Sequence, residues 1–401
     1  MKILFLTDNF PPEVNAPATR TFEHCVEWVK HGAEVTVITC APNFPKGKVY
    51  PGYKNKLIQK EIIEGIDVIR VWSYIAANEG FLKRTIDYIS FSISAFIGGL
   101  FVKTDLIIAT SPQFFTALSG RTLSFWKRKP WVMEVRDLWP ESIKTVGAMN
   151  DNFFIRYFEW QEKRCYKSAK KIISVTDSFK VEIINKGIAA DKIEVVKNGA
   201  NLALYQPMLP DEALIDSLNL KGKIILGYVG THGMAHKLDF LMDCAKKLLH
   251  TNYHFLFIGS GAEREKLLLK RQVEQITNVT LLDSVSKKEI KAYLSILDVS
   301  LINLKRDKLF KTVIPSKIFE NAAMQIPILL GVDGESRAIL EHYQAGLFYE
   351  PENEQDFMNK LNQIMQKENK ETFQSGGKKL AVDFDRKKLA LHMLTHLRNT
   401  I

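Results

Sequence analysis

The sequence predicts an α/β protein built from two Rossmann-like, doubly wound parallel sheets. Short apolar, β-branched runs alternate with longer amphipathic stretches along the whole chain, which is typical of βαβ units with buried strands. About twelve such runs occur, too many for one sheet, so we expect two sheets of roughly five to seven strands each. The length of 401 residues also favours more than one domain.

The apolar runs predict the strands in chain order. Those of the first half stand at 2–6, 34–39, 67–71, 105–109, 131–135, 171–175 and 193–196. Those of the second half stand at 224–228, 254–258, 279–282, 299–302 and 327–330. Between the first two runs, Phe22, Val26 and Val29 share one face of a predicted helix, and Gly32 supplies its stop.

The domain boundary is expected where the alternation breaks. The segment 197–210, KNGANLALYQPMLP, is rich in turn residues. It predicts an N-terminal domain at 1–205 and a C-terminal domain at 206–380. A last amphipathic helix at 386–398 has no strand after it and is free to pack on either domain. We expect residues 381–401 to pack back on the first.

Composition and charge exclude several classes of protein. Apolar residues make up 46% and charged residues 25%, so fibrous, collagenous and disordered proteins are excluded. The four cysteines form no C-x-x-C pair, which supports neither a disulfide framework nor a zinc site and favours a reducing, cytosolic setting. The net charge is +10, and residues 1–200 hold 28 basic against 21 acidic side chains. This excess indicates an anionic partner such as phosphate or phospholipid, or simply a solvated surface. Nucleic acid is not expected, because no aromatic-and-basic reader motif is present.

The segment 85–102, TIDYISFSISAFIGGLFV, is unusually apolar. Three interpretations stay open: a half-buried helix covering the sheet, a helix dipping into the membrane interface, and a membrane span. Lys83, Arg84, Lys103 and the basic cluster 121–129 would attract an anionic leaflet.

Ligands of open parallel sheets bind beyond the carboxyl ends of the strands. Two domains facing across a cleft would there hold a donor and an acceptor. P-loop nucleotidases and dinucleotide oxidoreductases are disfavoured, because neither a G-x-x-x-x-G-K-[ST] nor a G-x-G-x-x-G after the first strand occurs. Gly259 and Gly261 form only a G-x-G, which fits a phosphate turn or an ordinary tight turn. The one D-x-D match, 383–385, is interpreted as a solvated cap, so no metal site is expected.

The segment TVIPSKIFENAAMQIPILL carries more chemical information. Pro315 and Ser316 open a helix that ends before Pro327. A helix start receives phosphate well, and Lys317 adds a full charge there. Glu320, one turn later, is placed to accept hydrogen bonds from ribose hydroxyls. The alternative is an ordinary capped helix.

Seven segments together resemble a known family. They are FLTDNFPPEVNAPATR, EVRDLWPES, KNGANLALYQP, GYVGTHGMAHKLDFL, FIGSGAEREKL, NVTLLDSVSKKEI and IPSKIFENAAMQIPIL. Their order and spacing resemble the family-4 retaining glycosyltransferases of the GT-B fold. The branch most similar is the bacterial capsule and O-antigen branch that includes N-acetyl-L-fucosamine transferases. The resemblance implies sugar transfer from a nucleotide diphosphate to an acceptor hydroxyl, with retention of configuration and without a metal or other cofactor.

The resemblance assigns roles position by position. Glu320 is the second glutamate of the family's E-x(7)-E pair, whose first falls on Thr312. The family's diphosphate-binding arginine and lysine fall on Thr231 and His236, so Lys317, Lys237 and Arg306 are the available cations. The family's histidine after the fifth strand falls on Arg136, beside Asp137. Expected donor-binding residues are Gly230, Thr231, His236, Gly259, Gly261, Ser284, Val285, Arg306, Ser316, Lys317 and Glu320. Expected catalytic residues are Asp137, Arg136 and Glu13, and expected acceptor-binding residues are Asn15, Arg20 and Ser111.

We therefore expect transfer of a sugar from a UDP-sugar to an undecaprenyl-diphosphate-linked saccharide, in capsule or O-antigen biosynthesis. N-acetyl-L-fucosamine is the sugar that the resemblance favours. The protein would be cytoplasmic and peripherally bound to the inner leaflet of the plasma membrane. Two alternatives remain: a nucleotide-sugar 2-epimerase of the same fold, and a non-catalytic nucleotide-sugar-binding subunit.

Overall fold

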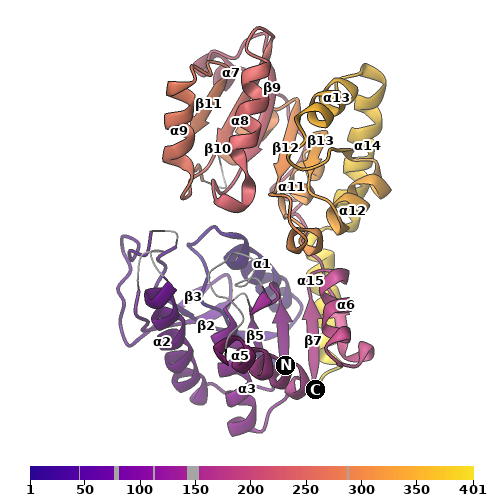
Figure 1. Cartoon of the computed structure of the whole chain (residues 1–401). Coiled ribbons are helices and arrows are strands. Elements are labelled where there is room, and N and C mark those ends of the chain that lie inside the picture. The colour runs from indigo at the N-terminus through magenta and orange to yellow at the C-terminus, as the bar shows by residue number, and fades with distance from the viewer. Residues whose placement is uncertain (45, 76–80, 112, 142–152, 287–288) are drawn as a thin grey trace. The chain divides into compact units, whose positions relative to one another are not determined.

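The computed structural model describes the chain except residues 45, 76–80, 112, 142–152 and 287–288. It divides into two compact units, Met1–Lys197 with Arg386–Ile401, and Asn198–Asp385. Each unit is a largely parallel sheet with helices packed against it (Figure 1). The predicted α/β class with two doubly wound sheets is confirmed.

The sheet of the first unit has eight strands in the order β3-β4-β2-β1-β5-β6-β7-β8. Only β3 runs antiparallel to its neighbour. The strands are β1 (Lys2–Leu6), β2 (Glu34–Cys40), β3 (Ile58–Ile63), β4 (Ile66–Val71), β5 (Leu106–Thr110), β6 (Trp131–Val135), β7 (Lys171–Ser174) and β8 (Ile193–Val195). Its helices are α1 (Ala16–Lys30), α2 (Phe81–Leu100), α3 (Phe114–Lys127), α5 (Phe153–Ser168), α6 (Asp177–Asn185) and α15 (Arg386–Arg398).

The sheet of the second unit has six parallel strands in the order β11-β10-β9-β12-β13-β14. They are β9 (Ile224–Val229), β10 (Tyr253–Ile258), β11 (Val279–Leu282), β12 (Val299–Asn303), β13 (Ile328–Gly331) and β14 (Gly346–Phe348). The helices are α7 (Glu212–Ser217), α8 (Leu238–Lys247), α9 (Arg264–Val273), α10 (Ile290–Ser295), α11 (Lys317–Ala323), α12 (Glu335–Tyr343), α13 (Glu354–Ile364) and α14 (Lys367–Asp383).

Two strands escape the sequence analysis, so the first sheet has one strand more than expected. β3 is an edge strand whose residues are alternately half-buried and exposed, because only one of its faces meets the protein. Its sequence IQKEII is therefore not a continuous apolar run. β14, with the sequence GLF, has three residues and is too short to stand out.

The units divide at Lys197 rather than at the predicted residue 205, because residues 198–205 pack with the second unit. Ala200 and Tyr205 are buried in its core. The amide of Ala200 also donates to the carbonyl of Phe384, 3.1 Å away, so both ends of this unit lie together. The return to the first unit correspondingly begins at Arg386 rather than at 381.

Helix α15 completes the core of the first unit. Its residues Ala390, Met393 and Leu394 are buried in one cluster with Trp28 of α1. The indole nitrogen of Trp28 donates to the carbonyl of Ala390 at 2.8 Å. A helix from the far end of the chain therefore forms one wall of this core.

Helix α2, which the apolar segment 85–102 forms for most of its length, is half-buried. Phe91 and Ala95 are buried, while Ile93 and Ile97 are 56% and 50% exposed. The hydroxyls of Ser92 and of Ser119 on α3 lie 2.7 Å apart, so Ser92 faces a neighbouring helix. Among the described residues no helix is both long and apolar enough to cross a membrane.

Candidate functional site

In the first unit, polar side chains gather where β1, β5 and β6 end. The hydroxyl of Ser111, after β5, accepts from the backbone amide of Arg136, after β6, at 2.9 Å. The Arg136 guanidinium donates to the carbonyl of Pro17 in α1 at 3.2 Å. Burial lowers the pKa of Arg136 to about 10, and the charge of Glu134 opposes the shift. Arg136 thus remains a cation at neutral pH, and the half-exposed Asp137 follows it directly.

Glu13 lies in the loop after β1 and is a buried carboxyl group. One of its oxygens accepts from the amides of Asn43 and Phe44, at 2.7 and 2.8 Å. Its other oxygen, Oε2, is buried without a hydrogen-bond partner. Burial raises the pKa of Glu13 to about 7, and the nearby charge of Asp8 adds to the rise. A carboxyl group with this pKa can take up or release a proton at neutral pH.

Two of the expected acceptor-binding residues support the fold of the first unit. Arg20 is 2% exposed and forms an ion pair with Glu134 at 2.9 Å. It also donates to the carbonyls of Val196 and Lys197, both at 2.8 Å. Asn15 caps α1 by accepting from the amide of Ala18 at 2.9 Å. Their contacts hold the start of α1 against the ends of β6 and β8.

In the second unit, the ammonium group of Lys317 lies over the face of the Tyr228 ring, 3.7 Å from its centroid. Lys317 opens α11, and Tyr228 lies in β9. Burial lowers the pKa of Lys317 to about 7, and the Glu320 charge opposes the shift. No side chain among the described residues forms a salt bridge with Lys317. Its charge is therefore held by an aromatic face and not by a carboxylate.

Glycine makes this arrangement possible. Gly230 has a φ of 138°, and a β-carbon there would lie 2.6 Å from the Lys317 ammonium nitrogen. At Gly259, with a φ of 152°, a β-carbon would lie 1.8 Å from the carbonyl oxygen of Gly230. The turn after β10 thus packs directly on the turn after β9. A β-carbon at Gly261 would in the same way meet the backbone of His232.

Two histidines follow β9, and both are held neutral. His232 is fully buried, and neither ring nitrogen has a hydrogen-bond partner. Burial lowers the pKa of His232 to about 4 and that of His236 to about 3, and the charge of Lys317 adds to both shifts. Their rings lie 6.0 and 5.9 Å from the Tyr228 ring. Lys317 is therefore flanked by neutral imidazoles.

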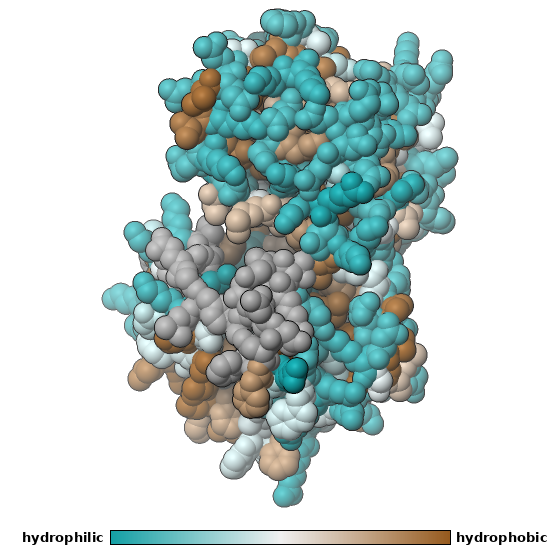
Figure 2. Space-filling model, viewed as in Figure 1, coloured by the Kyte–Doolittle hydropathy of each residue, from teal (hydrophilic) through white to brown (hydrophobic). Residues whose placement is uncertain are grey.

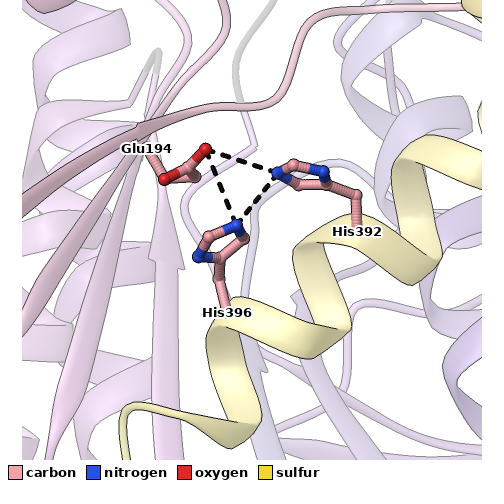
Figure 3. A group of neighbouring side chains, drawn as sticks. All are labelled: Glu194, His392 and His396. Carbon is pink, nitrogen blue, oxygen red and sulfur yellow. Dashed lines mark hydrogen bonds and ion pairs between the residues drawn. The ribbon is translucent and has the colours of Figure 1, made fainter.

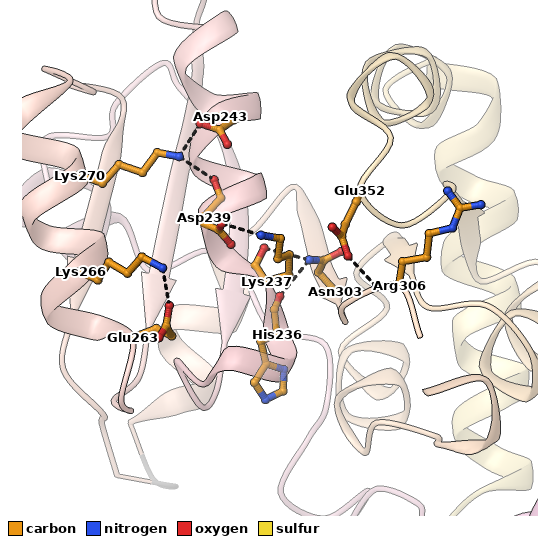
Figure 4. A network of polar contacts seen from close by, with 10 residues as sticks. All are labelled: His236, Lys237, Asp239, Asp243, Glu263, Lys266, Lys270, Asn303, Arg306 and Glu352. Carbon is orange, nitrogen blue, oxygen red and sulfur yellow. Dashed lines mark hydrogen bonds and ion pairs between the residues drawn. The ribbon is translucent and has the colours of Figure 1, made fainter. Parts of the chain in front are cut away.

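The loops after β9 and β12 are tied together (Figure 4). The amide nitrogen of Asn303 donates to the carbonyls of His236 and Lys237, at 2.9 and 3.2 Å. The Tyr349 hydroxyl donates to the side-chain oxygen of Asn303 at 2.6 Å and so fixes the orientation of this amide. Lys237 itself pairs with Asp239 at 2.8 Å. This network holds His236 next to the Tyr228 ring.

The remaining predicted donor residues lie farther out. Arg306 is exposed and pairs with Glu350 at 2.8 Å, in a small hollow that Lys311 and Asp333 also line. Ser284 is exposed, and its hydroxyl donates to that of Ser260 at 3.0 Å. Thr231 is exposed, and Val285 and Glu320 are half-buried. Ser316 is the N-cap residue of α11, but its side chain makes no capping hydrogen bond.

Several residues of these groups were missed by the sequence analysis. Tyr228 is hidden in an apolar strand, where an aromatic residue predicts only core. His232 precedes the expected His236 by four positions in the same polar loop, so the repeated histidine was the available signal. Asp8, beside Glu13 and Arg136, was not among the predicted site residues. Burial raises its pKa, and its carboxylate accepts from Gln113 at 2.9 Å.

The backbone amide of Gly230, an expected donor-binding residue, is not free to bind a phosphate. It donates to the carbonyl of Ile258 at 2.8 Å and so extends the hydrogen bonding of the sheet. What the second unit offers an anion is therefore the Lys317 side chain on its aromatic support, with neutral donors around it.

Comparisons with known proteins follow the division of the chain. The Glycosyltransferase Family 4 profile matches residues 18–204, and the Glycosyl transferases group 1 profile matches residues 211–379. WcaI of Escherichia coli strain K12, which its name assigns to colanic acid biosynthesis as a glycosyl transferase, is 26% identical over 329 residues. That match covers 79% of this chain and 80% of WcaI.

Solved structures of similar fold cover the chain nearly completely. Sucrose-phosphate synthase from Thermosynechococcus elongatus has a TM-score of 0.81 at 16% identity and covers 99% of this chain and 98% of its own. Anabaena HepE, solved in complex with UDP-glucose, has a TM-score of 0.74 at 17% identity over the full length of both chains. At these identities the likeness concerns the fold.

Proposed function

Because the chain belongs to the group 1 glycosyltransferases of the GT-B fold, we propose that it transfers a sugar with retention from a UDP-sugar to a lipid-linked saccharide. The process would be the biosynthesis of a surface polysaccharide. WcaI, named for colanic acid biosynthesis, supports that class of product. HepE, solved with UDP-glucose, supports a UDP-sugar as donor. N-acetyl-L-fucosamine is the sugar we propose first, on the resemblance to capsule and O-antigen enzymes.

The observation that carries the proposal is Lys317 on the Tyr228 ring, 3.7 Å from its centroid. Departure of a nucleoside diphosphate leaves negative charge on the β-phosphate. A cation without a carboxylate partner is placed to neutralise that charge as it develops, and the low-dielectric surroundings strengthen the interaction. Two neutral histidines beside it add no competing positive charge and can donate or accept single hydrogen bonds.

Retention fits a mechanism in which the acceptor attacks from the face that the diphosphate leaves. The acceptor hydroxyl must lose a proton in this step. Glu13, with a pKa of about 7, and Asp137 are the candidate bases of the first unit. The departing phosphate is the third candidate. Transfer along this route uses Lys317 for charge neutralisation and needs no metal ion.

An apolar and basic surface on the first unit supports a lipid-linked acceptor. Where α2 and α3 end, Phe101, Phe125 and Trp126 are 82%, 81% and 67% exposed. The ammonium group of Lys127 donates to the carbonyl of Leu100 at 2.9 Å, which brings the two helix ends together. Brown side chains gather in the region of α2 in the view of Figure 2. Lys103, Arg128 and Lys129 follow these aromatic residues closely in the sequence and would attract the anionic inner leaflet.

The decisive experiment incubates the protein with a panel of UDP-sugars, with and without an undecaprenyl-diphosphate-linked acceptor. A new lipid-linked product that forms only with the acceptor, and keeps the anomeric configuration of the donor, supports the proposal. An epimerised sugar nucleotide without acceptor would instead identify a 2-epimerase. Binding of UDP-sugar without any product would identify a non-catalytic subunit.

The membrane part is tested separately by sedimentation with vesicles of phosphatidylglycerol at low salt. The variant Phe125→Ser/Trp126→Ser should bind the vesicles several-fold less tightly while transfer to a water-soluble acceptor analogue is unchanged. Equal vesicle binding of variant and wild type contradicts the membrane surface but leaves the transferase proposal standing.

A further inference from the structure

Three side chains of the first unit that play no part in the groups described above converge on one point (Figure 3). They are Glu194 of β8 and His392 and His396 of α15. One carboxylate oxygen of Glu194 lies 3.3 Å from Nε2 of His392 and 3.6 Å from Nε2 of His396. The two Nε2 atoms lie 3.0 Å from each other. Three potential ligand atoms thus form one compact triangle.

The size of this triangle matches a metal centre. Zinc binds imidazole nitrogen and carboxylate oxygen at about 2.0–2.1 Å, so two ligands of a tetrahedral site lie about 3.3 Å apart. The three separations of 3.0, 3.3 and 3.6 Å are centred on this value. A single point about 2 Å from all three atoms therefore exists, slightly above their plane.

The chemistry of the three groups also fits. Histidines at positions i and i+4 lie on one face of a helix, so both imidazoles reach the same point. Two imidazoles and one carboxylate suit zinc and leave a fourth position for water.

A hydrogen-bonded cluster without metal is less well satisfied. Each neutral imidazole carries one N–H, so only one of the two Nε2 atoms can donate across their 3.0 Å contact. If one Nε2–H points to the other ring, it does not also point to Glu194. A cation at the centre satisfies all three atoms at once.

We propose that Glu194, His392 and His396 form a Zn²⁺ site that fastens helix α15 to the edge strand β8. The fastening has a clear use, because α15 is separated in sequence from the rest of its unit by residues 198–385. Docking α15 closes a very long loop, and a metal that binds only the docked state adds its binding free energy to that docking. The proposed role is structural and is independent of the transferase reaction.

The test uses tag-free protein that has been stripped with EDTA and dialysed. Calorimetric titration with ZnCl₂ should show one Zn²⁺ bound per chain, and binding should raise the melting temperature of the protein. His392→Ala, His396→Ala and Glu194→Gln should each weaken Zn²⁺ binding at least about tenfold and abolish the rise. His392 is half-exposed and Glu194→Gln is nearly isosteric, so these variants remain folded.

The matched control is His250→Ala, an exposed histidine of the second unit. It should bind Zn²⁺ as the wild type does and show the same thermal shift. Absence of stoichiometric binding by the wild type overturns the proposal. So does Zn²⁺ binding that is equal in the wild type and in the His396→Ala variant. Neither result bears on sugar transfer.

Discussion

The Lys317 ammonium nitrogen lies 3.7 Å from the centroid of the Tyr228 ring, beneath a glycine that has no side chain to displace it. Lys317 at the start of α11, Tyr228 within β9 and Gly230 directly after β9 thus form one group that holds a cation. Because the pKa of Lys317 is about 7, its ammonium group is partly deprotonated near neutral pH. The pH dependence of donor binding therefore tests its role.

Donor binding should weaken with rising pH. Burial lowers the pKa of Lys317 to about 7, so its ammonium group loses a proton above that pH and with it the attraction for diphosphate. The kcat/KM for the UDP-sugar should fall between about pH 7 and pH 9, at most tenfold per pH unit. Lys317→Arg should flatten this limb, because a guanidinium stays charged. Lys317→Ala should reduce kcat/KM at least about a hundredfold at pH 7 with the fold intact. An unchanged kcat/KM in Lys317→Ala would exclude the diphosphate role.

A methyl group at Gly230 should displace Lys317. A β-carbon there would lie 2.5 Å from Cε of Lys317, and the φ of 138° disfavours any side chain. Gly230→Ala should therefore lower kcat/KM about tenfold or more. Gly233→Ala, where the nearest atom would be 3.6 Å away, is the matched control and should retain activity. Steady-state kinetics of the two variants make the comparison, and similar losses in both would contradict it.

Stability should depend on pH through Glu13. Its folded-state pKa is about 7, above the ordinary value of 4.5 for a glutamate. The folded state therefore binds more protons than the unfolded state between these values, and stability falls as pH rises through this window. Glu13→Gln should reduce the difference in unfolding free energy between about pH 5 and pH 8, as measured by urea denaturation. If Glu13 is also the base, kcat of this variant falls at least about a hundredfold. An unaltered pH dependence of stability would show that burial does not shift this carboxyl group.

Breaking the buried pair of Arg20 and Glu134 should destabilise the first unit. Burial raises the pKa of Glu134, but the charges of Arg20 and Arg136 outweigh that effect and hold it below the ordinary value. Arg20→Met leaves this carboxylate buried without its partner and should cost about 3–5 kcal/mol of unfolding free energy. The double variant Arg20→Met/Glu134→Leu should recover much of the loss. Breaking the exposed pair Lys246–Glu274 should change the unfolding free energy far less, because water and salt screen it. A folded Arg20→Met protein of unchanged stability that has lost only acceptor binding would instead support the acceptor role of Arg20.

Removal of divalent metal should leave sugar transfer intact. In the proposed mechanism Lys317 supplies the positive charge at the leaving group, so kcat and KM in EDTA should equal those in Mg²⁺. The assay is done at 25 °C, well below unfolding, so that a change in thermal stability does not enter. Activity that is lost in EDTA and restored by Mg²⁺ or Mn²⁺ would show that a metal ion takes part in the reaction.

The sequence predicted the sheets far better than the side-chain groups. Strands β1 and β6 were predicted to the residue, because continuous apolar runs occur where both faces of a strand are buried. β3 was missed because one of its faces is exposed. The groups depend on contacts between distant positions, which periodicity does not report. Glu194 and His392, for instance, are 198 positions apart. Their convergence follows only from the docking of α15.

Of the predicted site residues, Lys317, Gly230 and His236 lie close together, since strand ends of one sheet and the helix after them share an edge. Arg306 was predicted from its charge and its place after β12. In the structure its guanidinium is paired with Glu350, which follows β14 and which the sequence does not reveal as a partner. Charge and a place at the end of a strand or the start of a helix therefore pointed to both Arg306 and Lys317, and only the contacts distinguish them.

The order of synthesis on the ribosome gives α15 a further significance. Residues 386–398 are translated after the whole of Asn198–Asp385. Until they emerge, Trp28 has no cover from Met393 and Leu394, and its indole N–H lacks the Ala390 carbonyl. All strands of the second unit are translated before α15, so the second unit can fold while the core of the first unit still lacks this helix. In this protein the half that is translated first is the half that is completed last.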